Sequence, residues 1–241
     1  MKLYKIAYIT LIGLVSLVSN PIKKVTDNPI KKVHLQNYAL VNYSKKVEVL
    51  YNSLDSNNFK LPKLESFSKA LEGFYLLREK GVVQKDLLTI VDFSLSSREK
   101  RLWVIDMNCN KILFNSLVAH GKNSGDDYAN DFSNKKESNK SSLGFFATGE
   151  VYNGKHGMSL KLDGLEKGIN DNARQRAVVV HGATYVSNVF LKNHNRLGRS
   201  QGCPAIPVEL SKKIIQTIKD KSCLFIYHPS INYLEVSKLV S

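Results

Sequence analysis

Short runs rich in β-branched and aromatic residues dominate the sequence after residue 83. They span residues 87–93, 101–106, 111–118, 144–148, 159–162, 177–181 and 223–227. Residues of these types suit strands, and the polar turn at residues 107–110, between the second and third runs, is typical of a hairpin. With one further helical pattern at residues 208–219, the runs predict a mainly β domain of the α+β class.

A helical pattern precedes this β-rich part. Leu61 and Pro62 begin it, Gly81 ends it, and apolar residues recur between them at helical spacing: Leu64, Phe67, Ala70, Leu71, Phe74 and Leu77. We expect a helix within residues 61–82 that packs on the core. Looser spacing at residues 35–54 predicts a first helix, within a basic tether that spans residues 20–60. The domain proper is then expected over residues 83–241.

The first residues have the pattern of an export signal. Lys2 and Lys5 make a basic start, residues 6–18 carry no charge, and small and turn-forming residues follow. The apolar run is shorter than the roughly 20 residues of a membrane helix. We therefore expect residues 1–19 to be a cleaved signal, the protein to be periplasmic or extracellular, and no stable membrane span to remain. An uncleaved anchor is the alternative.

The charge balance points to a polyanionic partner. Lys and Arg total 35 against 21 Asp and Glu, a formal net charge of +14. Nucleic acid, an acidic membrane or an anionic cell-wall polymer would each be attracted. The sequence has no nucleic-acid-binding signature, and aromatic residues are not interleaved with the lysine pairs, so we expect no nucleic acid as a partner.

The cysteines differ in their surroundings. Three of them cannot all pair, and none has a CxxC spacing. Cys223 lies within an apolar strand run and is expected to be a core thiol, whereas Cys109 is expected in the hairpin turn. Cys203 lies between Gly202 and Pro204, after an apolar strand that ends at His181.

A cysteine and a histidine in this setting suggest a thiol nucleophile and its base. The thiolate is the attacking species, so a thiol needs a base, and a strand end holds an imidazole firmly. We expect Cys203 to be the nucleophile and His181 the base. Gly202 lets the backbone approach a substrate closely, and we expect the N–H groups of Gly202 and Cys203 to face the oxygen of a tetrahedral intermediate.

The same residues resemble the YkuD-type L,D-transpeptidases, specifically the murein L,D-transpeptidase catalytic domain family. The resemblance rests on residues 180–182 (Val-His-Gly) and 198–205 (Gly-Arg-Ser-Gln-Gly-Cys-Pro-Ala), and covers about residues 62–228. Further similar stretches are residues 101–106, 113–115, 118–121, 132–134, 141–145, 155–157 and 159–162. Two features depart from better-known members. Their Ser-His-Gly-Cys motif reads Ser-Gln-Gly-Cys here, so its histidine is absent, and residues 204–206 (Pro-Ala-Ile) replace an Arg-x-Asn tail.

The resemblance implies a YkuD-like β-sandwich or barrel, preceded by a short helical segment, that performs a two-step acyl transfer. Cys203 would attack the L-centred third residue of a peptidoglycan stem peptide and expel the terminal D-residue. His181 would hold the thiol as thiolate and protonate the leaving amine. A neighbouring stem's amine, or water, would then resolve the thioester, so that transpeptidation and carboxypeptidase activity both stay open.

The remaining site residues follow from the same resemblance. Gly182 offers its carbonyl to orient the imidazole, and Ser200 supports the nucleophile. The substrate-site candidates are His120, His156, Arg199 and Ser141, and for His120 and His156 we also expect a hydrogen-bonding role that shapes the site. We expect no cofactor, no metal, and a monomer that acts on stem peptides.

Two other functions remain as alternatives. A zinc-dependent peptidase could use His120, His156 and His181 as ligands with Cys203 as the fourth, although no HExxH motif is present. A non-catalytic, basic cell-wall-binding module would need no activated thiol. His194 lies in a polar stretch and is expected on an exposed loop, and His34 and His228 are expected to be structural or solvated.

Overall fold

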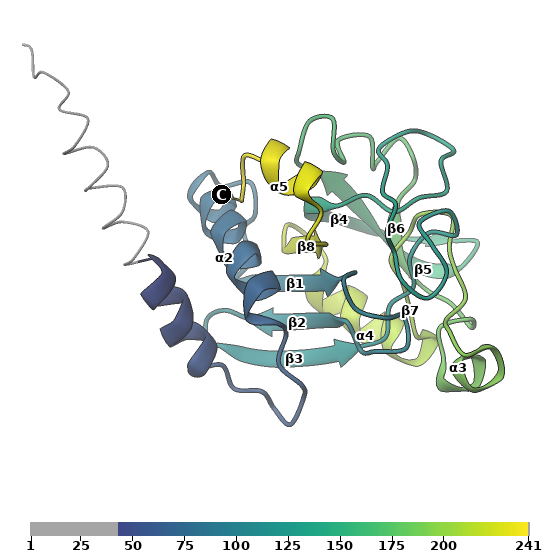
Figure 1. Ribbon diagram of the computed structural model, residues 1–241, viewed down its shortest axis with the longest axis horizontal. Helices are drawn as coiled ribbons and strands as arrows, with labels where there is room; N and C mark the ends of the chain where they lie inside the picture. Colours follow the sequence, from purple (N-terminus) through teal and green to yellow (C-terminus); the bar gives the residue numbers. More distant parts are fainter. Residues whose placement is uncertain (1–42, 241) are drawn as a thin grey trace, which may run out of the picture. The chain divides into compact units, whose positions relative to one another are not determined.

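The computed structural model describes residues 43–240, and the expected export signal, residues 1–19, lies outside them. Eight strands form one sheet in the order β3-β2-β1-β8-β4-β5-β6-β7 (Figure 1). Residues 43–52 are helical. The labelled elements are α2 (Leu64–Glu79), β1 (Leu87–Asp92), β2 (Leu102–Asp106), β3 (Lys111–Ser116), β4 (Gly144–Gly154), β5 (Gly157–Gly164), β6 (Val179–Gly182), α3 (Asn188–His194), β7 (Ala205–Ile206), α4 (Val208–Ile218), β8 (Cys223–Tyr227) and α5 (Ile231–Val236).

The first half of the sheet contains the predicted hairpin. β2 and β3 pair antiparallel, β1 pairs antiparallel with β2, and β1 lies parallel to β8. Cys109 is exposed in the turn between β2 and β3, and Cys223 is buried in β8, as expected for each. Every residue of β8 is buried, which accounts for its continuous apolar sequence.

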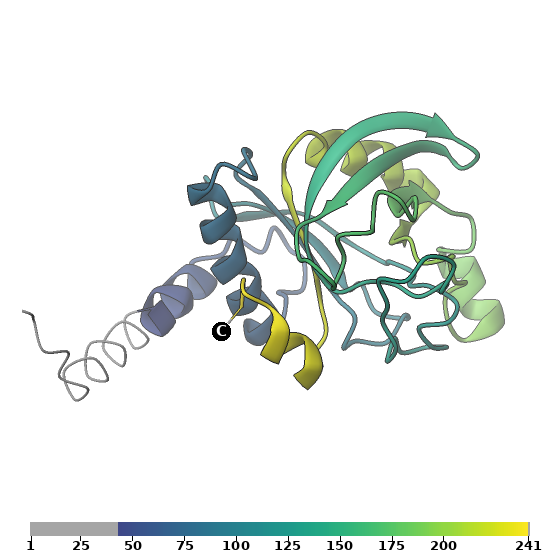
Figure 2. The ribbon, with the colours of Figure 1, turned by 90° about the horizontal axis from the view of Figure 1, so that it is seen from above.

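The second half of the sheet carries the site. β4 and β5 form a long antiparallel hairpin, which Figure 2 shows as the curved pair of green arrows. The register of this hairpin shifts between Thr148 and Val151, a bulge of the kind that bends strands. β5 pairs antiparallel with β6, where Ser159 lies opposite His181, and β6 runs parallel to β7.

The segment that follows β3 links the two edges of the sheet. β3 and β7 are the edge strands, and Ala119, just beyond β3, pairs antiparallel with Ala205 of β7. Gly121 then bridges to Ser200. The fold is therefore sheet-dominated and barrel-like, as predicted, and the bridge brings the segment after β3 next to the loop that carries Cys203.

Two helices pack on the sheet, one on its central strands and one on β5 and β6. α2 packs on β1 and β8 through the predicted apolar face, except that Leu64 is exposed. α4 packs on β5 and β6 through Ile214, Ile215 and Ile218. A Cβ on Gly182 would lie 2.8 Å from Ser211 Oγ, so glycine allows α4 to approach the end of β6. Within residues 43–240, no helix has the length and apolar character needed to cross a membrane.

Three elements were not predicted. α3 has no buried residue, so its sequence lacks the apolar periodicity that marks a helix, although Ser187 caps it by accepting a hydrogen bond from Phe190 N–H. β7 is only two residues long. α5 buries one side chain, Tyr233. The polar stretch 123–142 forms no helix or strand, and four residues within it are buried: Ser124, Ala129, Ser141 and Ser142.

Candidate active site

His181 lies at the end of β6 and is 3% exposed. Its Nδ1 is 2.9 Å from the carbonyl oxygen of Gly182. Because a carbonyl only accepts, Nδ1 carries the proton and donates, and Nε2 is left as the proton acceptor. Burial lowers the pKa of His181, and the nearby His156 and Lys155 add to the effect. The ring is therefore neutral near neutral pH, in the tautomer that a general base requires.

Cys203 precedes β7 and is partly buried. Its Sγ accepts a hydrogen bond from Val179 N–H at 3.5 Å and donates to the carbonyl of Ala177 at 3.7 Å. Burial raises the pKa of the Cys203 thiol, against smaller opposing effects of the hydrogen bond from Val179 N–H and of the charges of Arg176 and Lys155. The raised pKa favours the neutral thiol in the free protein, because desolvation outweighs these opposing effects. That His181 holds the thiol as a thiolate stays a prediction.

Cys203 and His181 line the same cavity, whose volume is about 840 Å³. Its walls come from residues 136–139, from the β4–β5 hairpin near its turn, from residues 175–185 and from residues 199–203. A volume of this size suits a peptide-sized ligand.

Ser200 shapes residues 199–203, the loop that carries Cys203 and that we call the nucleophile loop. Its Oγ accepts a hydrogen bond from Gly202 N–H at 3.0 Å and donates to the carbonyl of Cys203 at 2.6 Å. The supporting role expected for Ser200 is therefore visible. The N–H of Gly202 is already bonded, which contradicts its expected role as an oxyanion donor. Within residues 43–240 the N–H of Cys203 donates to no acceptor, so this N–H stays available to bind an oxyanion.

Ser141 supports the same loop and does not line the cavity. It is 1% exposed, accepts a hydrogen bond from Gly121 N–H at 3.0 Å and donates to the carbonyl of Gly202 at 3.2 Å. The expected contact between Ser141 and a substrate is wrong, because both its hydrogen bonds tie the segment after β3 to the nucleophile loop.

His120 is also a buried support. It is 1% exposed, with Nδ1 at 2.8 Å from Arg101 Nη2 and Nε2 at 3.2 Å from the carbonyl of Gly125. A guanidinium only donates, so Nδ1 accepts and Nε2 donates. Burial, followed by the charge of Arg101, lowers the pKa of His120 to about 4. His120 is absent from the cavity lining, which does not fit a substrate contact, but its hydrogen bonds agree with the expected site-shaping role: its carbonyl accepts a hydrogen bond from Ser200 N–H at 2.9 Å.

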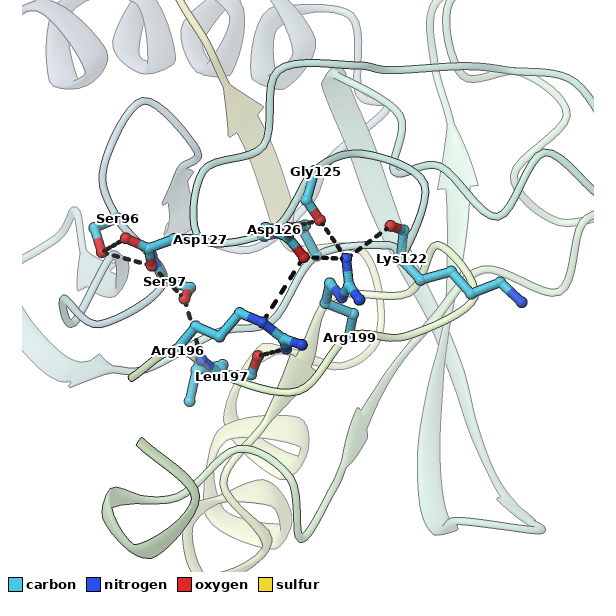
Figure 3. A network of polar contacts seen from close by, with 10 residues as sticks. Ser96, Ser97, Lys122, Gly125, Asp126, Asp127, Arg196, Leu197 and Arg199 are labelled. Atoms are coloured by element: carbon cyan, nitrogen blue, oxygen red, sulfur yellow. Dashed lines mark hydrogen bonds and ion pairs between the residues drawn. The ribbon is translucent and has the colours of Figure 1, made fainter. Parts of the chain in front are cut away.

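Arg199 connects the cavity to the loop after Gly121 (Figure 3). It lines the cavity, and its Nη1 donates to Asp126 Oδ1 at 2.6 Å and to the carbonyl of Gly125 at 3.0 Å. Arg196 Nε lies 3.8 Å from the same carboxylate oxygen. Arg199 therefore reaches the site while its Nη1 ties the nucleophile loop to the loop after Gly121.

His156 lies in the turn between β4 and β5, exposed and on the cavity wall. Its ring stacks on that of His181, with centroids 4.4 Å apart and an interplanar angle of 19°. The structure thus brings together Cys203, His181 and His156.

The three-histidine zinc site is not formed. His120 lies away from the cavity, and across residues 43–240 no group of three or more His, Cys, Asp or Glu side chains is arranged to hold a metal ion. His194 is exposed at the end of α3, where it stacks on Phe190, and His228 is half-buried beside Phe132.

Two further residues of the site carried no sequence signal. Arg176 is half-buried, and its guanidinium donates to the carbonyls of Ser133 and Lys140 at 2.7 and 2.6 Å, which holds the 133–142 segment beside the cavity. Tyr185 lines the cavity, and burial raises the pKa of its hydroxyl to about 12. A lone arginine before a strand and a tyrosine after it are unremarkable in sequence, and only the fold brings them to the thiol.

Comparison with known protein families identifies the family of this chain. A family model described as the L,D-transpeptidase catalytic domain matches residues 60–227, which include both strands and loops of the site. No curated protein sequence matches the chain.

Solved structures with some similarity include an L,D-transpeptidase from Mycobacterium smegmatis, at 11% identity over 59% of both chains with a TM-score of 0.37. The helical cell shape determining protein from Campylobacter jejuni has 15% identity over 67% of this chain and 57% of its own, with a TM-score of 0.38. The chain spans less than two thirds of the length of either protein. With the family model matching well over half of its residues, the chain belongs to the L,D-transpeptidase catalytic domain family.

Proposed function

We propose that this protein catalyses cysteine-dependent acyl transfer on peptidoglycan stem peptides. The reaction is L,D-transpeptidation, with L,D-carboxypeptidase activity when water takes the place of the acceptor amine. The observation that carries the proposal is that Cys203 and His181 line one peptide-sized cavity, with the imidazole held by Gly182 in the tautomer of a base. Membership of the family supports the substrate class.

The first half-reaction starts from two neutral groups. His181 Nε2 takes the proton of the Cys203 thiol as the sulfur attacks the carbonyl carbon of the third stem residue. The carbonyl oxygen becomes an oxyanion. The free backbone N–H of Cys203, on the attacking residue itself, is the donor that would stabilise it. The C–N bond then breaks, and the imidazolium gives its proton to the leaving amine of the terminal D-residue. A thioester on Cys203 and a neutral His181 remain.

The second half-reaction reverses the roles. An acceptor amine from a neighbouring stem attacks the thioester, His181 removes the amine's proton, and the thiol leaves with that proton. Water in place of the amine gives hydrolysis. Cys203 and His181 supply the nucleophile and both proton transfers, so the proposed reaction uses no cofactor and no metal.

We place the reaction outside the cytoplasm. Residues 1–19 have the pattern of an export signal, and the net charge of +14 favours accumulation on an anionic cell-wall polymer. We propose that the exported chain acts as a monomer, because one chain supplies every group that the mechanism uses.

The test is product analysis with a disaccharide-tetrapeptide as substrate. We expect loss of the terminal residue, and dimers when a second stem is present, both detected by mass spectrometry. Cys203→Ala should abolish both products, while Cys109→Ala, at an exposed thiol outside the cavity, should leave them unchanged. Binding of the polymer without turnover would favour the non-catalytic cell-wall-binding module instead.

A further inference from the structure

The β4–β5 hairpin delivers a second imidazole to the catalytic base. β4 and β5 are joined by a tight turn, where Gly157 has a φ of +74°. His156 directly precedes that glycine and stacks on His181 with ring centroids 4.4 Å apart. The two histidines are distant in sequence and come from different elements, so the stack is a product of the fold and not of local chain geometry.

The position of the absent motif histidine makes this stack informative. Residue 201, beside the nucleophile, is glutamine in this chain and lines the same cavity. His156 is the other imidazole on that cavity wall, besides His181, among residues 43–240.

On the basis of the proposed function, we propose that His156 is a positioning residue for the acyl transfer, whose stacked ring fixes the orientation of His181. Two contacts then fix the orientation of the His181 ring. The bond from Nδ1 to the carbonyl of Gly182 fixes one edge, and His156 covers one face. Rotation about χ2 would break both, so Nε2 keeps its direction through both half-reactions.

The stack also affects charge, because either ring can take up a proton. Two protonated rings at this distance repel each other, and this repulsion adds to the burial that lowers the pKa of His181. Removing the charge of His156 while keeping its ring should therefore make His181 easier to protonate.

Other charged groups face the same cavity and remain in every variant below. Lys155 is on the same turn as His156, Arg176 and Tyr185 are on the segment around β6, and Arg199 and Cys203 are on the nucleophile loop. The pair Lys136 and Glu137 completes the rim. If the acid limb of the pH profile of kcat/KM differs between wild type and a His156 variant, the difference therefore comes from the removed imidazole.

The experiment compares His156→Ala and His156→Phe with the wild type in the full chain, using a disaccharide-tetrapeptide. Phenylalanine preserves the stack: Phe190 and His194 of this chain already stack at 4.0 Å and 16°. We expect His156→Ala to lower kcat by about tenfold or more, with KM changed less than about threefold. His156→Phe should restore kcat to within about threefold of wild type at mildly alkaline pH. The acid limb of kcat/KM should move to higher pH in His156→Phe.

A matched control and the contrary outcomes keep the test sharp. His194→Ala removes an exposed, stacked imidazole outside the cavity and should change neither kcat nor the pH profile. Wild-type kcat in His156→Ala, equal losses in the Ala and Phe variants, or an unmoved acid limb would each overturn the positioning role. Inactive wild-type protein would instead count against the proposed function, so the two failures are distinguishable.

Discussion

Burial shifts the pKa values of the two side chains that we propose to react. The pKa of Cys203 is raised and that of His181 lowered, in both cases chiefly by desolvation. These shifts favour a neutral thiol and a neutral imidazole in the free protein. In the proposed mechanism the proton therefore moves when substrate is attacked, unlike in cysteine enzymes whose thiolate is already formed in the free protein.

The first prediction is that Cys203 alkylates slowly in the free protein. Iodoacetamide reacts with thiolates, and the raised pKa leaves few of them at neutral pH, so the rate at Cys203 should keep rising above about pH 9. Cys109 is exposed and serves as the internal reference. Peptide mapping after timed alkylation measures both sites. Faster labelling of Cys203 than of Cys109 at neutral pH would show a preformed thiolate.

A second prediction concerns the buried His120. Its pKa in the folded state is about 4, against 6.5 in the unfolded chain, so the unfolded state binds the proton more readily. The contribution of neutral His120 to the free energy of unfolding is complete above pH 6.5 and is lost as the pH falls from there to about 4. The loss of unfolding free energy should approach about 3 kcal/mol.

Denaturant unfolding across this pH range measures the effect. His120→Gln keeps an acceptor for Arg101 and removes the titration, so its free energy of unfolding should fall less steeply with acid than that of the wild type. Parallel curves for the two proteins would contradict the assignment of this pH dependence to His120.

At the scale of elements, the nucleophile loop depends on a backbone conformation that only glycine adopts easily. Gly202 has a φ of +125°, and a Cβ there would lie 2.8 Å from the carbonyl oxygen of Lys140. The loop is held from both sides, by Ser200 within it and by Ser141 from the neighbouring segment. A side chain at residue 202 must therefore move Cys203 or the 133–142 segment.

We predict that Gly202→Ala lowers kcat by about tenfold or more, because small displacements of a nucleophile are costly. The strained backbone should also destabilise the fold by about 1–3 kcal/mol. Gly168→Ala is the matched control: Gly168 has a φ of +80°, open space around its Cα and no place in the cavity wall. It should lose stability without losing activity. Full activity in Gly202→Ala would show that the reaction does not depend on the backbone conformation at residue 202.

The elements differ in how far the sequence determines them. Strands such as β1 and β8 are buried and rich in β-branched residues, so their sequence alone marks them. α3 is held by its cap and by contacts of the segments that flank it: Gly198 N–H donates to the carbonyl of Tyr185, and Leu197 N–H donates to Ser97 Oγ from a distant part of the chain. Such contacts leave no periodic pattern to detect.

For the whole molecule, the sequence pointed to Cys203 and His181, and the fold brings both to one cavity. Their catalytic roles stay a proposal. Residue type does not reveal burial, so Ser141 was expected to contact substrate although its side chain is buried, and for His120 the structure agrees with the hydrogen-bonding role and not with the substrate contact. Pairings such as Ala119 with Ala205, which close the sheet around the site, depend on chain segments that meet only in the folded protein.

The central claim is that Cys203 becomes covalently acylated by the stem peptide. We would mix the full chain with disaccharide-tetrapeptide, quench with acid and measure the intact mass, followed by peptide mapping. The account predicts an adduct equal to the substrate without its terminal residue, attached to Cys203 and absent from Cys203→Ala, that disappears when an acceptor stem is added. Turnover without this adduct, or an adduct on another residue, would contradict it.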